Sequence, residues 1–99
     1  MGYNSSTGFH TASMSRTYFA QEGDSGPIKI GASSNPWARV HEGNTWNPRQ
    51  LRLLLVIEGC CERDLHKRFA HLRIRGEWFR SDPELVDFIN DELDSQDDE

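Results

Sequence analysis

The chain has 99 residues, enough for one compact domain with a modest hydrophobic core and too few for two. Its longest apolar stretch, residues 53–57, is far below the roughly 20 residues that cross a bilayer, so we expect a soluble protein with no membrane partner. The net charge of −5 divides unevenly, because residues 81–99 hold nine acidic and no basic side chains while residues 1–80 carry +4. A basic body of this kind permits a nucleic-acid partner, and solubility alone also explains the acidic segment.

The first half of the chain predicts an arm, a β-hairpin and a helix. Residues 1–15 are rich in Ser, Thr and Gly and show no sustained period, so we expect a flexible N-terminal arm. Two β-prone runs, residues 17–21 and 27–31, flank a polar, glycine-bearing loop and predict a hairpin. Ser34-Asn35-Pro36 is typical of a helix start, and the helix should end near Gly43.

The second half predicts one more strand and two helices. Residues 51–58 are almost continuously apolar, which predicts a strand covered on both faces and favours it as the central strand. Residues 60–73 have apolar side chains at helical spacing, and Ser81-Asp82-Pro83-Glu84 opens a third helix. The element order predicts one α+β domain over residues 16–93, with a small three-stranded, mainly antiparallel sheet flanked by helices. Residues 94–99 should form a disordered acidic tail.

Glu62 is the side chain that packing explains least well. It places a carboxylate at the edge of the apolar stripe of the second helix, where it should reach solvent, pair with an arginine or hold a cation. His66, one turn later on the same side, is a candidate second ligand or substrate contact. Arg39, Tyr18 and Lys29 each fit an ordinary surface or strand position when they are considered one at a time.

Taken together, these residues resemble the GIY-YIG endonuclease superfamily, in particular its phage-T5-type branch. The first motif of the family falls on Arg16-Thr17-Tyr18, which keeps the closing tyrosine. The second motif falls on Lys29-Ile30-Gly31, which keeps the closing Ile-Gly, and the branch also tolerates a lysine there. Arg39 follows this motif by eight residues, as the helical arginine of the family does. The resemblance spans residues 16 to about 89.

The helix after the third predicted strand carries the most specific part of the resemblance. Glu62 opens this helix, where the family has its metal-binding glutamate. The run Glu62-Arg63-Asp64-Leu65-His66-Lys67-Arg68-Phe69 is similar to the signature of the phage-type branch, as is Gly76-Glu77-Trp78-Phe79. The resemblance implies an endonuclease with one divalent ion that hydrolyses nucleic-acid phosphodiester bonds, with DNA favoured over RNA.

The resemblance also implies a role for each matching residue. Tyr18 would activate or orient the attacking water, and Lys29 would contact the phosphate and assist the tyrosine. Arg39 would stabilise the charge of the transition state, because a fixed guanidinium complements the phosphoryl oxygens. Glu62 would hold Mg2+ or Mn2+, since hard divalent ions prefer oxygen ligands.

Further residues are candidates for supporting roles. His41 and His66 are suited to proton transfer, because histidine titrates near neutral pH. His41, Arg68 and Arg73 are candidates for substrate binding. We expect Glu77-Trp78 to close the domain around its core rather than to take part in chemistry.

Two other functions are compatible with the sequence. The first is a binding module of the same fold that lacks turnover and recognises a nucleic acid or a protein. The second is a structural or regulatory mini-protein that uses Trp37, Trp46 and Trp78 as an interface, as a homodimer or inside a larger complex. The adjacent Cys60 and Cys61 make a poor structural disulfide, so reduced thiols and a cytoplasmic location, in a bacterial or phage-infected cell, are expected.

Overall fold

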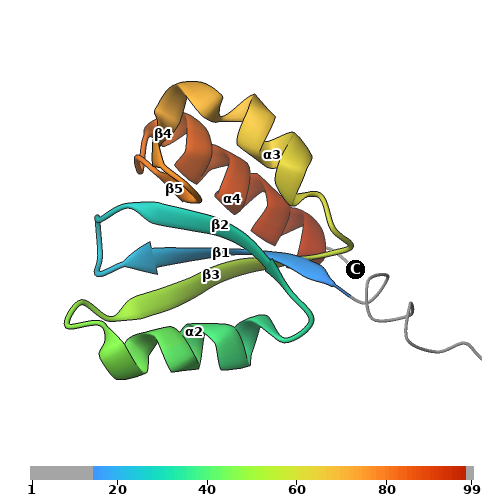
Figure 1. Ribbon diagram of the computed structural model, residues 1–99. Coiled ribbons are helices and arrows are strands. Elements are labelled where there is room, and N and C mark those ends of the chain that lie inside the picture. Colours follow the sequence, from blue (N-terminus) through green and yellow to red (C-terminus); the bar gives the residue numbers. More distant parts are fainter. Residues whose placement is uncertain (1–14, 98–99) are drawn as a thin grey trace, which may run out of the picture.

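The computed structural model describes residues 15–97, and within them one antiparallel sheet carries helices on both faces (Figure 1). In chain order the elements are β1 (Arg16–Glu22), β2 (Ile28–Ser33), α2 (Pro36–Trp46), β3 (Leu51–Glu58), α3 (Glu62–Arg68), a 3-10 turn (Ala70–Leu72), β4 (Arg73–Arg75), β5 (Trp78–Phe79) and α4 (Pro83–Asp97). The predicted N-terminal arm lies outside these residues except for Ser15. Among the described helices, none has both the length and the apolar character needed to traverse a bilayer.

The sheet has the strand order β3-β1-β2-β5-β4, and every neighbouring pair is antiparallel. Helix α2 covers one face, and α3 and α4 cover the other (Figure 1). The predicted α+β class and the antiparallel sheet are confirmed. The sheet also gains β4 and β5, which are too short to show a period in sequence and meet through a turn at Gly76, whose φ is +53°.

Strand β3 has the predicted bounds and is covered on both faces by α2 and α4, but its predicted central position is wrong. Among the strands of residues 15–97 it pairs with β1 alone and forms one edge of the sheet. The physical reason is that helices on both faces of a sheet bury both faces of a strand, so an edge strand has a continuous apolar sequence just as a central strand does. The sequence pattern therefore reports face coverage and not the number of neighbouring strands.

Helix α2 begins as predicted and ends later than predicted. The Asn35 side chain accepts a hydrogen bond from the Ala38 amide, and Pro36 occupies the first turn. The helix passes through Gly43 and ends at Trp46. The Asn44 side chain donates to the Leu51 carbonyl and accepts from the Leu51 amide, at 3.1 and 2.6 Å, and so ties the last turn to β3. This long-range clamp has no signal in local sequence.

The last two helices also differ from the predicted bounds. Helix α3 stops at Arg68 and gives way to the 3-10 turn, where the Leu72 amide donates to the Phe69 carbonyl at 2.8 Å. Helix α4 continues to Asp97, so the tail predicted as disordered is helical over residues 94–97. The Gln96 side chain donates to the Val56 carbonyl at 2.8 Å and attaches the last turns to β3. Residues 98–99 lie outside the described range.

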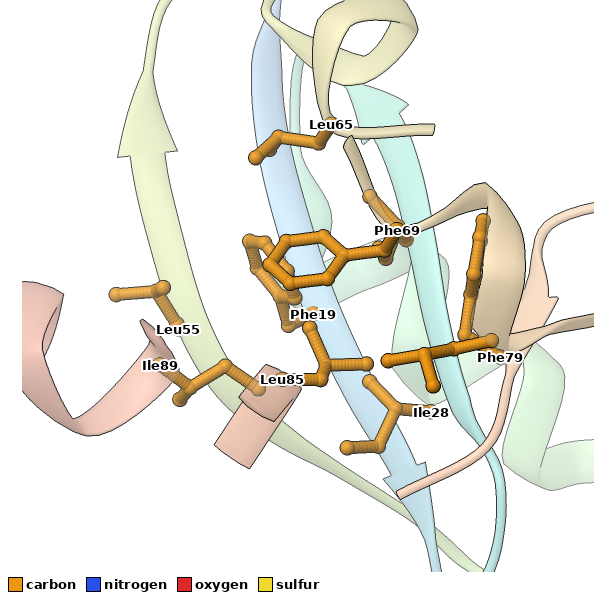
Figure 2. Close-up of a cluster of buried hydrophobic side chains, with 10 residues drawn as sticks. Phe19, Ile28, Leu55, Leu65, Phe69, Phe79, Leu85 and Ile89 are labelled. Atoms are coloured by element: carbon orange, nitrogen blue, oxygen red, sulfur yellow. The ribbon is translucent and has the colours of Figure 1, made fainter. Parts of the chain in front are cut away.

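The hydrophobic core is divided unequally between the two faces of the sheet. The larger cluster lies under α3 and α4 (Figure 2) and consists of Phe19, Ile28, Ile30, Leu55, Leu65, Phe69, Leu72, Phe79, Leu85 and Ile89. The smaller cluster lies under α2 and has three buried members, Tyr18, Ala20 and Val40, with Leu51, Leu53 and Val56 partly buried against them. A face with so few apolar residues depends on the tyrosine ring for packing, and it leaves room for a pocket beside that ring.

Candidate functional site

Tyr18 is held on the α2 face of the sheet by its strand partner. It lies opposite Gly31 in the β1–β2 register and is 1% exposed. A Cβ atom at residue 31 would lie 2.9 Å from both Cζ and the hydroxyl oxygen of Tyr18, closer than real Cβ contacts. The absence of a side chain at Gly31 therefore lets the tyrosine ring lie flat across the neighbouring strand.

We expect Gly31→Ala to destabilise the domain by about 1–3 kcal/mol, because the added methyl group overpacks a buried ring. Urea unfolding followed by circular dichroism measures the change. In a Tyr18→Leu background the same substitution should cost much less, since the long ring is gone. An equal cost in the two backgrounds would show that the ring contact is not the cause.

Tyr18 lines a pocket of about 290 Å³ between the sheet and α2, called here the tyrosine pocket. Its lining residues are Tyr18, Lys29, Arg39, Val40, Glu42, Gly43, Trp46 and Leu51. The structure thus brings three of the predicted site residues together from β1, β2 and α2. The Lys29 ammonium lies 6.0 Å from the centroid of the tyrosine ring, and Lys29 side-chain exposure is 24%.

The polar groups of this pocket are largely free of internal partners. Within residues 15–97 the Tyr18 hydroxyl makes no hydrogen bond, and the Arg39 guanidinium makes no ion pair or hydrogen bond. A buried hydroxyl without a partner is costly, unless water or a ligand in the pocket supplies one. The pocket therefore offers two cations and one hydroxyl to an anionic ligand, against one carboxylate, that of Glu42.

The same strand that carries Tyr18 positions the start of α3. Thr17 is fully buried, and its hydroxyl donates to the Gly59 carbonyl at 3.1 Å and accepts from the Cys61 amide at 2.9 Å. Gly59 has φ +90°, which turns the chain from β3 toward the helix. Glu62, the first residue of α3, is therefore placed by a hydrogen-bonded loop rather than by a flexible connection.

Glu62 lies beside a second carboxylate, Glu77, in the turn before β5. Burial raises the pKa of Glu62, and hydrogen bonding to Glu77 and its negative charge raise this pKa further, whereas His66 and Lys29 lower it. The Lys29 ammonium is 3.9 Å from the Glu77 carboxylate, and His66 Nε2 is 3.8 Å from the Glu62 carboxylate. Lys29 thus connects the tyrosine pocket to the carboxylate pair.

The carboxylate pair does not share the tyrosine pocket. Glu62 lines a separate hollow of about 370 Å³ at the start of α3, whose lining residues are Cys60, Cys61, Glu62, Arg63 and Asp64. Cys60 and Cys61 are both free thiols. The structure therefore places the predicted residues in two adjacent sites, with Lys29 and Glu77 between them.

The donor set at Glu62 fits a hard divalent ion with few protein ligands. No cluster of three or more His, Cys, Asp and Glu side chains in the described range forms a complete metal cage. Mg2+ commonly takes one or two carboxylates and fills its other positions with water and substrate phosphate. Glu62 and Glu77 supply such oxygen ligands, and a cation between them would relieve the repulsion of two neighbouring carboxylates.

His66 has a structural contact that the sequence did not predict. Its Nε2 atom lies 2.9 Å from the Ile30 carbonyl oxygen, and its ring packs against Phe79 with centroids 5.1 Å apart. Because a carbonyl oxygen only accepts hydrogen bonds, Nε2 carries a proton. This contact ties α3 to β2 and fixes the ring next to Glu62.

The other predicted binding residues lie away from the tyrosine pocket. His41 is exposed on α2 and is not part of the pocket lining. The Arg68 guanidinium lies over the rings of Phe69 and Phe88, and that of Arg73 lies over Phe79, at 4.8 to 5.4 Å from the ring centroids. These arginines cover aromatic residues of the larger core cluster, so the structure does not bring them to the predicted site.

Glu77, which was expected from the sequence to close the core, lies beside Glu62 and Lys29 in the structure. Its side chain is half-exposed and contacts Lys29 rather than the apolar core. The available signal was that this charged residue stands inside the motif Gly76-Glu77-Trp78-Phe79, which the resemblance had already singled out. Only the fold shows that this turn lies beside the first residue of α3.

The fold and the pocket define a small α+β domain with a basic, aromatic site on one sheet face. The chain belongs to the T5orf172 domain family, whose model matches residues 15–94. This family is related to GIY-YIG-like nuclease domains, which makes the chain a nuclease-like or nucleic-acid-binding module. No curated protein and no solved structure matches the chain.

Proposed function

We propose that this domain is a metal-dependent endonuclease that hydrolyses phosphodiester bonds of nucleic acid, with DNA preferred to RNA. One observation carries the proposal: Tyr18, Lys29 and Arg39 line a single solvent-open pocket next to the carboxylate of Glu62. The family relationship to nuclease-like domains supports the same reaction class.

The cationic residues of the pocket bind and polarise the phosphate. The Arg39 guanidinium has no internal partner in the described residues and can donate two parallel hydrogen bonds to phosphoryl oxygens. The Lys29 ammonium holds a third oxygen as a point charge, and Glu77 keeps that side chain near the pocket. Their positive charges stabilise the transition state, in which negative charge accumulates on the equatorial oxygens.

The tyrosine orients the nucleophile. The Tyr18 hydroxyl accepts a hydrogen bond from a water, whose oxygen forms the new bond to phosphorus while the bond to the leaving oxygen breaks. The proton that the water loses passes through solvent to the leaving oxygen, which departs as a hydroxyl group. Burial of the ring against Gly31 fixes the direction of the hydroxyl, which reduces the entropy lost on reaching the reactive geometry. The carboxylates of Glu62 and Glu77 would hold Mg2+ or Mn2+. Such an ion, when bound, polarises the phosphoryl group and neutralises charge on the leaving oxygen.

The direct test is a cleavage assay on supercoiled DNA, linear DNA and RNA with Mg2+, Mn2+ or a chelator. We expect cleavage only with a divalent ion, and a roughly 100-fold lower kcat for Tyr18→Phe, since the ring stays and only the orienting hydroxyl is lost. Equal melting temperatures would confirm that the variant is folded. Full activity of Tyr18→Phe would remove the tyrosine from the mechanism.

Binding without cleavage under every divalent ion would contradict the enzyme and establish an inactive binding module. A gel-shift assay on the same substrates separates these outcomes. Absence of both cleavage and binding would instead indicate a protein partner.

A further inference from the structure

Trp46 is the most exposed of the large apolar side chains in the described residues, at 86%. It lies at the last position of α2 and lines the rim of the tyrosine pocket. Trp37, on the same helix, is 57% exposed and has the Arg16 guanidinium 6.0 Å from its ring. Within residues 15–97, Trp46 has no aromatic or cationic partner. The indole ring at the pocket rim is therefore open to solvent.

The position of Trp46 relative to Arg39 is fixed by the helix. Seven residues separate them, which is close to two turns, so both side chains lie on the same side of α2. The rise between them is about 10 Å, a span comparable to a nucleotide from its phosphate to its base. Trp37 precedes Trp46 by nine residues and therefore points to the opposite side of the helix.

We propose that Trp46 is a stacking platform for an unpaired nucleobase whose neighbouring phosphate occupies the tyrosine pocket. The inference rests on the proposed function and adds to it the class of substrate, a strand with at least one unpaired base at the cleavage site. Lys29 and Arg39 supply the charge that attracts the phosphate, and the indole supplies a flat apolar surface at the right distance from them.

The exposed indole favours an unpaired base over a duplex. Bases inside a duplex are already stacked on both faces, so an aromatic side chain at the surface gains little from them unless a base leaves the stack. Stacking on an aromatic ring is tolerant of base identity, because every base has a π face. Recognition at Trp46 is therefore structural and not specific for sequence.

Affinity for short single-stranded DNA, measured by fluorescence anisotropy in chelator, tests the proposal without any cleavage. Two probes are used, one intact and one with abasic residues throughout. We expect Trp46→Ala to weaken binding of the intact probe roughly ten-fold or more. Trp46→Phe should keep most of the affinity, and the control Trp37→Ala should keep nearly all of it. The abasic probe should bind weakly to wild type and equally weakly to Trp46→Ala.

Three outcomes would overturn the inference. The first is an unchanged affinity of Trp46→Ala for the intact probe. The second is an equal loss on the intact and abasic probes, which would mean that Trp46 only supports the end of α2. The third is a dimer that Trp46→Ala converts to a monomer in sedimentation, since the indole would then be a subunit contact.

The binding result and the cleavage result are independent. If cleavage depends on metal but Trp46→Ala binds DNA as tightly as wild type, the stacking platform is overturned and the proposed endonuclease activity stands. If Trp46→Ala loses binding but wild type shows no cleavage with any of the divalent ions, the proposed endonuclease activity is overturned and the stacking platform stands.

Discussion

Replacing Glu62 with glutamine should lower the cleavage rate about 1,000-fold or more, because the site loses the charge that holds the divalent ion. A bound metal contributes several kcal/mol of transition-state stabilisation, and each 1.36 kcal/mol is a factor of ten in rate. The substitution keeps the size of the side chain and removes only its charge. The rate of single-turnover cleavage with Mg2+ or Mn2+ measures the effect.

Asp91→Asn is the control, since it removes one negative charge at an exposed position of α4, outside the hollow that Glu62 lines. It should retain most of the activity. A second readout does not depend on cleavage: Mn2+ should raise the melting temperature of wild type and leave that of Glu62→Gln unchanged. Equal activity of the two variants, or an equal metal shift, would contradict the role of Glu62.

The same carboxylate should make stability depend on pH. Burial and the Glu77 carboxylate raise the pKa of Glu62 in the folded protein. Below about pH 4.5 the Glu62 carboxyl is protonated in both the folded and the unfolded protein, so it does not lower the free energy of unfolding. As the pH rises through the pKa of the folded protein, ionisation favours the unfolded chain and stability is lost.

Glu62→Gln removes this dependence, so it should melt a few degrees above wild type at neutral pH in chelator and at the same temperature in acid. Thermal unfolding of both proteins between pH 4 and 8 measures the difference. A wild type that melts higher than the variant at neutral pH would contradict the direction of the pKa change. The expected gain in stability with loss of activity is typical of a site kept for chemistry.

Local signals predicted the parts of the fold that depend on neighbouring residues. The start of α2 follows from Asn35 and Pro36, and the hairpin of β1 and β2 follows from two short apolar runs around a polar loop. The extent of α2 beyond Gly43 depends on a clamp between Asn44 and Leu51, residues that meet only in the folded chain. Boundaries set by such long-range contacts have no counterpart in local sequence.

The candidate site shows the same division. The resemblance to the GIY-YIG superfamily selected Tyr18, Lys29 and Arg39, and the structure brings these three side chains to one pocket. From the sequence, Glu77 was expected to close the core and Trp46 was a candidate for a protein interface. A half-exposed acid in a turn and a tryptophan at a helix end do not indicate a nucleic-acid site until their neighbours are known. Arg68 and Arg73 stand at plausible positions in the sequence, but their side chains cover aromatic rings of the core, away from the tyrosine pocket.

Arg39→Lys should reduce kcat by about 100- to 1,000-fold while DNA binding changes little. Lysine keeps the positive charge that attracts the phosphate, but it lacks the planar fork that donates two hydrogen bonds at once. The loss therefore falls on the transition state, where the phosphoryl oxygens gain charge, rather than on ground-state affinity. Single-turnover rates and anisotropy titrations on the same DNA separate the two effects.

Arg49→Lys, at an exposed position after α2, is the control and should leave both the rate and the affinity unchanged. Equal losses of rate and affinity in Arg39→Lys would mean that Arg39 binds substrate uniformly and does not act selectively in the chemical step.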